Sequence, residues 1–160
     1  MQIHTTYVPG AIGDVAALHA RYYARHWGFG LGFEAAVATD LAEFLNRATA
    51  TDLILLAEDN QGIAASLFLD LHYPASGARG AKLRWFIVAN RLRGQGIGRQ
   101  MMTRAVAHID THSDGQAWLE TFAGLHSARH LYEDFGFRLT VEAKGDGYGT
   151  TVLEQEFRRG

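Results

Sequence analysis

The fold of this chain is decided by residues 86–99, FIVANRLRGQGIGR. Before the glycines, residues 82–88 have the composition of a central β-strand. After them, apolar residues recur at helical spacing at Met101, Met102, Ala105, Val106 and Ile109. The chain therefore passes from a strand through a glycine-rich turn directly into a helix. A helix start offers unpaired N–H groups and a partial positive charge, and Arg91, Arg93 and Arg99 add countercharge, so this junction predicts a pyrophosphate site.

The glycine spacing excludes two familiar phosphate-binding loops. No Lys-Ser or Lys-Thr follows the turn, as a Walker A loop would need, and Gly94, Gly96 and Gly98 are spaced G-x-G-x-G, not G-x-G-x-x-G. Glycines of this kind are also found in turns that only begin a helix. The residues alone therefore do not identify which phosphate-containing ligand binds here.

The rest of the chain predicts a mixed α/β domain around this junction. We expect strands at 3–8, 53–57, 63–71, 118–122, 137–141 and 151–157, and helices from Ile12 to near Gly28, at 33–45 and at 128–135. Residues 28–32 are predicted to be a flexible connection and residues 72–80 an exposed loop. The order β-α-α-β-β-β-α-β-α-β-β indicates layers of helices against a sheet, in a single domain over residues 1–160.

Composition narrows the class of protein. The 160 residues contain no cysteine, which excludes disulfides, thiolate metal sites and a cysteine nucleophile. The net charge of −2 argues against a general nucleic-acid binder. The longest apolar run, Leu53 to Ala57, is too short for a membrane span, and the N-terminus lacks the pattern of a signal peptide. We expect a cytoplasmic protein that binds neither nucleic acid nor membrane.

Two motifs resemble those of the GNAT (Gcn5-related) N-acetyltransferases. Residues 93–98, RGQGIG, fit the R/Q-x-x-G-x-G/A signature of that family. The second motif, A-x-x-L-Y-x-x-x-G-F, matches at Ala128, Leu131, Tyr132, Gly136 and Phe137. With the two upstream helices and the hairpin, the resemblance covers essentially the whole chain, and it is strongest to bacterial proteins in which this domain can follow a MarR-type helix-turn-helix domain. It implies the GNAT fold, a mixed and mostly antiparallel sheet flanked by helices, and acetyl-CoA as co-substrate.

The resemblance also assigns cofactor-binding residues. The strand before the glycines would pair its backbone with the pantetheine arm at Phe86, Ile87 and Val88. The following amides would hold the pyrophosphate at Arg93, Gly94, Gln95, Gly96, Ile97, Gly98 and Arg99. One position departs from the family. Many relatives carry an asparagine seven residues before the tyrosine, where this chain has Leu125.

Acetyl transfer to an amine needs a base for the amine and an acid for the departing thiolate. Tyr132 occupies the family's position for the acid; the alternative is a packed aromatic residue. Glu120 lies in a segment similar to that of ribosomal-protein alanine acetyltransferases, where the glutamate is the base; the alternative is a solvent-facing or ion-paired side chain. Residues 82–88 contain no carboxylate. Glu34 or a water molecule is the other candidate base.

An aromatic cluster near the connection of the first two helices is the candidate acceptor wall. It comprises His26, Trp27, Phe29 and Phe33, beside Glu34, and the same residues could simply pack together. The pairs His108/His112 and His126/His130 have i, i+4 spacing but lack a third ligand, so we predict no metal.

The resemblance predicts an acetyl-CoA-dependent N-acetyltransferase acting on a primary amine of a small molecule or a protein. The alternative is a non-catalytic acyl-CoA-binding regulatory module on the same fold. Because the final strands alternate apolar residues and GNAT domains frequently dimerise, we also expect a homodimer.

Overall fold

Seven strands and four helices follow one another in the predicted order in the computed structural model, which describes residues 1–160. The helices are α1 (Ala11–Trp27), α2 (Leu31–Arg47), α3 (Ile97–His112) and α4 (His126–Asp134). The strands are β1 (Gln2–His4), β2 (Leu53–Asp59), β3 (Gly62–Asp70), β4 (Ala81–Val88), β5 (Ala117–Phe122), β6 (Arg138–Gly145) and β7 (Val152–Arg159). Short 3₁₀ turns occupy Gly77–Arg79 and Asn90–Leu92.

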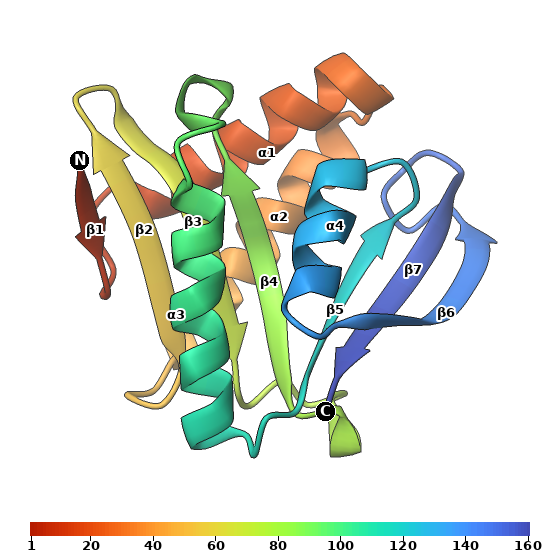
Figure 1. Cartoon of the computed structure of the whole chain (residues 1–160). Coiled ribbons are helices and arrows are strands. Elements are labelled where there is room, and N and C mark those ends of the chain that lie inside the picture. The colour runs from red at the N-terminus through yellow and green to blue at the C-terminus, as the bar shows by residue number, and fades with distance from the viewer.

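All seven strands form one sheet in the order β1-β2-β3-β4-β5-β7-β6, and β4–β5 is its only parallel pair. The predicted mixed, mostly antiparallel sheet is therefore confirmed. The parallel pair is joined at only two positions, Ala81 with Ala117 and Lys82 with Trp118. Beyond Lys82 the two strands diverge (Figure 1). The β5-facing backbone of residues 83–88 consequently has no strand partner.

A β-bulge lies in β4 where the two strands separate. Ser66 pairs with Ile87 and Phe68 with Arg84, so two residues of β4, Trp85 and Phe86, oppose the single residue Leu67 of β3. Trp85 has a φ of 46°, which is rare for a large side chain, and its carbonyl accepts a hydrogen bond of 2.6 Å from the Ser66 hydroxyl.

The bulge interrupts the alternation of side chains along β4. Arg84 and Trp85 both lie on the α2 side of the sheet, with the guanidinium 4.0 Å from the indole centroid. Trp85 also packs on Phe44 of α2, and Phe86 packs on Tyr132 of α4. A regular strand would place Trp85 and Phe86 on the opposite faces from these. The bulge therefore turns Trp85 toward α2 and Phe86 toward α4.

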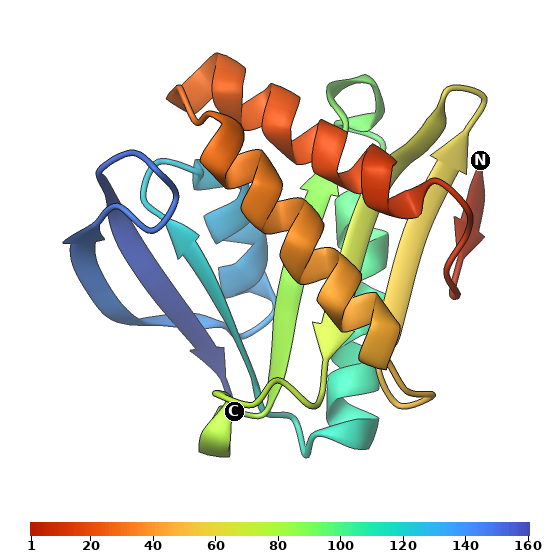
Figure 2. The same cartoon turned by 180° about the vertical axis from the view of Figure 1, so that it is seen from behind.

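Helices cover both faces of the sheet. α3 and α4 cover one face (Figure 1), and α1 and α2 cover the other (Figure 2). The larger core, between the sheet and α3 and α4, includes Leu67, Met101, Met102, Phe137 and Phe157. The smaller core, under α1 and α2, includes Val15, Leu41, Phe44, Leu56 and Phe68. Figure 2 shows that α1 and α2 lie over the β2–β4 part of the sheet, beside the divergence.

Two predicted segments need correction. The strand predicted at 3–8 is only β1, because the chain pairs with the end of β2 from Gln2 to His4 and then leaves the sheet to enter α1. The connection predicted at 28–32 is only residues 28–30, since α2 begins at Leu31. It is also anchored: Gly28 ends α1 in the left-handed conformation, and Phe29 is buried. None of the helices is both long and apolar enough to span a membrane.

Candidate active site

The glycine-rich turn between β4 and α3 presents a row of free backbone amides. Gly94 and Gly96 both have a φ of 79°, a conformation that glycine adopts without strain, and Gly96 caps the N-terminus of α3. None of the six amides from Gly94 to Arg99 donates a hydrogen bond within the protein. Six successive donors at a helix N-terminus are suited to a pyrophosphate, as the sequence predicts.

The arginines around this turn are not equally available. Arg91 donates to Asp59 at 2.7 and 3.0 Å, and this ion pair lowers the pKa of Asp59 to about 2. Arg99 donates to Asp134 at 2.7 Å and lowers the pKa of that carboxyl as well. Arg93 has no carboxylate partner; its guanidinium lies 4.9 Å from the centroid of the Tyr22 ring. Of the three predicted countercharges, only Arg93 is free of an ion pair.

A groove of about 330 Å³ runs from this turn along the open side of β4. It is lined by eight of the ten predicted cofactor-binding residues: Phe86, Ile87, Val88, Arg93, Gly94, Gly96, Ile97 and Gly98. Gln95 and Arg99 lie outside the lining. The opposite wall is the start of α4, with Ser127, Ala128 and Leu131, and Leu125 borders the groove where many relatives have asparagine.

A second cavity of about 500 Å³ begins where the groove ends. Tyr23, Phe86 and Leu125 line both, so the two spaces meet at the divergence of β4 and β5. The walls of the cavity come from α1, α2, β4, β5, Tyr132 of α4 and the turn between β6 and β7. A cofactor in the groove would thus present its reacting end to the cavity.

Three tyrosines, Tyr23, Tyr132 and Tyr148, line this cavity. Burial raises the pKa of Tyr23 to about 12, and it raises the pKa of Tyr132 and of Tyr148 further. All three phenols therefore remain protonated at neutral pH and can act as hydrogen donors. The Tyr132 hydroxyl has no hydrogen-bond partner in the protein, while its ring is buried against Phe86, Phe137 and Phe157.

Glu120 of β5 also lines the cavity. Its carboxylate is half exposed and lies 2.9 Å from the ammonium group of Lys82. Lys82 is itself buried, with its nitrogen 3.9 Å from the centroid of the Tyr73 ring. Glu120 and Tyr132 therefore line the same cavity. The ion pair with Lys82 agrees with the alternative interpretation of Glu120 as an ion-paired side chain, and the position in the cavity is compatible with a role as base.

The predicted acceptor wall is divided by the structure. Phe33 lines the cavity, whereas His26, Trp27, Phe29 and Glu34 do not. Phe29 is buried behind Phe33 and Tyr148, with ring centroids 5.1 and 5.9 Å away. Trp27 packs edge-to-face on Phe122, and His26 packs on Tyr22. Trp27 and Phe29 therefore support the wall from behind, whereas His26 and Glu34 are exposed, and Tyr22 lines the groove rather than the cavity.

Several cavity residues were not identified from the sequence: His19, Tyr23, Asp40, Arg84 and Tyr148. Tyr148 follows three glycine-turn residues and packs on Phe122 at 5.1 Å, so the β6–β7 turn completes the wall. Asp40 shares a helix face with Phe33 and Val37 at i, i+4 and i+7 spacing, a signal that could have placed it beside them. No group of three or more His, Asp or Glu side chains is arranged to hold a metal ion, and the stacked His108 and His112 rings bond to backbone carbonyls.

Solved structures with the same fold include several acetyltransferases. A ribosomal-protein-alanine N-acetyltransferase from Brucella melitensis is 16% identical, with a TM-score of 0.75 over 99% of this chain and 98% of that one. A spermidine N-acetyltransferase from Vibrio cholerae is 17% identical, with a TM-score of 0.66 over 99% and 94%. The yncA protein of Salmonella typhimurium, solved with its cofactor acetyl-CoA, is 14% identical, with a TM-score of 0.71 over 98% and 91%. The comparison with curated protein sequences finds no match.

The family comparison covers the segment that carries both motifs. The profile of the family described as "Acetyltransferase (GNAT) domain" matches residues 50–139, more than half of the chain. That range runs from β2 to the start of β6 and contains the amide turn, the divergence of β4 and β5, and Tyr132. The chain has the GNAT fold and belongs to the family of GNAT acetyltransferases, whose members use acetyl-CoA.

Proposed function

We propose that this protein is an N-acetyltransferase that transfers the acetyl group of acetyl-CoA to a primary amine of a small molecule or a protein. The observation that carries the proposal is the junction of two spaces at the divergence of β4 and β5. One space offers Arg93 and free amides of the glycine-rich turn for the pyrophosphate, and the other offers protonated phenols and carboxylates. Binding alone would need only the first.

The groove supports acetyl-CoA in an extended form. The pyrophosphate would accept hydrogen bonds from the amides of residues 94–99, and the pantetheine arm would pair with the open edge of β4 at residues 86–88. The thioester would then lie beside Phe86 and Tyr23, at the mouth of the cavity. The shape of the groove thus supports a pose in which the reacting carbon would meet the acceptor.

In the proposed reaction the amine nitrogen attacks the thioester carbonyl carbon, and the carbon–sulfur bond breaks. Tyr132 would donate its phenolic proton to the departing thiolate, because its hydroxyl is protonated and bonded to nothing in the protein. Glu120 would accept the proton that the amine loses, directly or through water. The Lys82 ammonium 2.9 Å away would hold the carboxylate in place.

The test of cofactor binding is calorimetry with CoA on Gly98→Val. A Cβ at Gly98 would lie 3.4 Å from Phe86 Cζ and 3.7 Å from Val88 Cγ2, so the valine methyls would occupy the groove without a backbone change. Gly96 is less suitable, since its φ of 79° would strain any other residue. Gly13 of α1 has open space around it, so Gly13→Val is the matched helical control.

We expect Gly98→Val to weaken CoA binding at least tenfold and Gly13→Val to leave it unchanged. Arg93→Ala should also weaken binding, by about 10- to 150-fold, because a hydrogen bond to a charged group contributes about 1.5–3 kcal/mol. Wild-type affinity in both groove variants would refute the proposed cofactor site.

The alternative function, a non-catalytic acyl-CoA-binding module, would bind CoA in the same groove. It predicts CoA binding without thiol release for any amine, and a panel of acceptors with acetyl-CoA distinguishes the two. We further propose that residues 1–160 act as one cytoplasmic domain, that this domain dimerises, and that it is functionally similar to the acetyltransferase domains of MarR-linked proteins. The exposed edge strand β6, with Val141 at 52% exposure, is compatible with dimerisation, which light scattering would measure.

A further inference from the structure

We propose that the acceptor is an organic amine that is cationic at its distal end as well and carries no anionic group, and that Asp40 and Asp146 bind this distal end. The inference rests on the proposed transferase function and names the class of its second substrate. It follows from the balance of charges and hydrogen-bond acceptors in the cavity of about 500 Å³.

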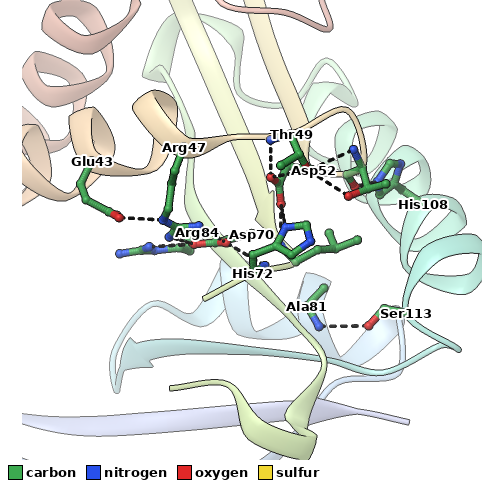
Figure 3. A network of polar contacts seen from close by, with 12 residues as sticks. Glu43, Arg47, Thr49, Asp52, Asp70, His72, Ala81, Arg84, His108 and Ser113 are labelled. Carbon is green, nitrogen blue, oxygen red and sulfur yellow. Dashed lines mark hydrogen bonds and ion pairs between the residues drawn. The ribbon is translucent and has the colours of Figure 1, made fainter. Parts of the chain in front are cut away.

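The cavity has two cationic side chains, and both are already paired. Lys82 is paired with Glu120 at 2.9 Å. Arg84 lies 3.3 Å from Asp70, a carboxylate with no exposure that also binds Arg47 at 2.5 and 2.9 Å. Figure 3 shows the guanidinium groups of Arg47 and Arg84 both beside the Asp70 carboxylate. An anionic group on the acceptor would have to compete for these cations, and removing Arg84 from a buried carboxylate is costly.

Two carboxylates of the cavity, in contrast, have no cationic partner. Asp40 on α2 and Asp146 in the β6–β7 turn line the cavity, and neither has a cationic partner within 4 Å. An adjoining cavity of about 490 Å³ shares Glu120 and Tyr148 and adds Glu154, whose carboxylate accepts only the Gly147 N–H, at 2.9 Å. Unpaired negative charge therefore lies on both sides of the acceptor space.

His19 provides a second, independent indication. It is buried, and its Nδ1 donates a hydrogen bond of 2.8 Å to the carbonyl of Val15, which leaves Nε2 unprotonated and without a partner. His19 lines the cavity. Because burial lowers the pKa of this imidazole to about 4, Nε2 can only accept a hydrogen bond at neutral pH. It suits an N–H donor and not a carboxylate oxygen.

Aromatic rings complete the cavity, and they suit the same class of ligand. Besides Phe86 and Tyr132, described above, the rings belong to Tyr23, Phe33, Trp85, Phe122 and Tyr148. The faces of these rings attract cations, pack against an alkyl or aryl chain and repel anions. The hydroxyl groups of Tyr23 and Tyr148 can bind a cation or an anion, so they do not distinguish between the two. The acceptor that matches all these groups is an apolar chain with a reacting amine at one end and a cation at the other.

Three compounds of equal length test the proposal: 1,5-diaminopentane, 1-aminopentane and 5-aminopentanoate. Calorimetry with the whole protein and saturating CoA measures acceptor binding without transfer. We expect the diamine to bind at least tenfold more tightly than the aminopentanoate, with the monoamine between them. Equal or tighter binding of the aminopentanoate, or no binding of the diamine at about 1 mM, the upper end of usual substrate affinities, would overturn the inference.

Substitutions at Asp40 and Asp146 test whether these two carboxylates cause the preference for the diamine. Asp40→Asn and Asp146→Asn should each lower the ratio of diamine to aminopentanoate affinity, while Glu34→Gln should leave it unchanged. Glu34 is on the same helix as Asp40 but does not line the cavity, so the control removes an equal charge. An equal drop in Glu34→Gln would refute a local role for Asp40. Thiol release with any amine, whatever the order of affinities, would still support the proposed transferase function.

Discussion

The sharpest prediction concerns Tyr132→Phe, because the structure separates its effects on stability and on catalysis. The Tyr132 hydroxyl has no hydrogen-bond partner in the protein, while its ring packs on Phe86, Phe137 and Phe157. Phenylalanine keeps these ring contacts. Since no polar partner is left unsatisfied, the free energy of unfolding should stay unchanged or rise by up to about 1 kcal/mol.

The effect on turnover should be large. General acid catalysis contributes about 10²–10⁴-fold, so the loss of the phenolic proton should raise the activation barrier by about 3–5 kcal/mol. The assay is release of free thiol from acetyl-CoA with the best amine of the panel, together with calorimetry for CoA. We expect kcat to fall by that factor while the affinity for CoA stays near the wild-type value.

Two other phenols of the same cavity supply matched controls. Tyr23→Phe and Tyr148→Phe remove hydroxyl groups that line the same space, and each should lower kcat by less than about tenfold, below the range of an acid catalyst. If Tyr132→Phe keeps full kcat, or if all three variants lose activity equally, Tyr132 is a packing residue and the assignment of the acid is wrong.

The remaining predictions concern the base and a buried histidine. Glu120→Gln should lower kcat and flatten the acidic limb of the pH–rate profile, because glutamine cannot take up a proton; an unchanged profile would transfer the role to water. Burial holds the pKa of His19 at about 4 against an ordinary value of 6.5, so the unfolded chain binds a proton in this range that the folded chain does not. The stability of the protein should therefore fall as the pH drops from 6.5 to 4, and His19 should account for up to about 3 kcal/mol of that loss. Urea unfolding at pH 4.5 and 7 measures it: His19→Gln should reduce the pH dependence, and the exposed His126→Gln should not. The same pH dependence in wild type and His19→Gln would contradict the prediction.

Local sequence signals predicted the order of the elements and the strand–turn–helix junction. The strand–turn–helix junction depends on residues within a few positions of one another, so the glycines at 94, 96 and 98 and the apolar spacing of α3 were sufficient. The boundaries were less accurate at β1 and at the α1–α2 connection. There, pairing with β2 and the burial of Phe29 decided where the elements end, and both depend on distant segments.

Only the tertiary structure decided the acceptor side of the site. The bulge at Trp85 and the divergence of β4 from β5 arise from strand pairing, which no single strand's sequence specifies. Packing also brings Tyr148, His19 and Asp40 to one cavity from three separate elements, and it pairs Arg91 and Arg99 with carboxylates while Arg93 stays free. The sequence by itself thus determined the glycine-rich wall of the groove, because residues 86–98 are one continuous segment, whereas packing brings α1 and α4 to its other walls. The acceptor cavity is built from side chains far apart in the chain, and long-range packing alone brings them together.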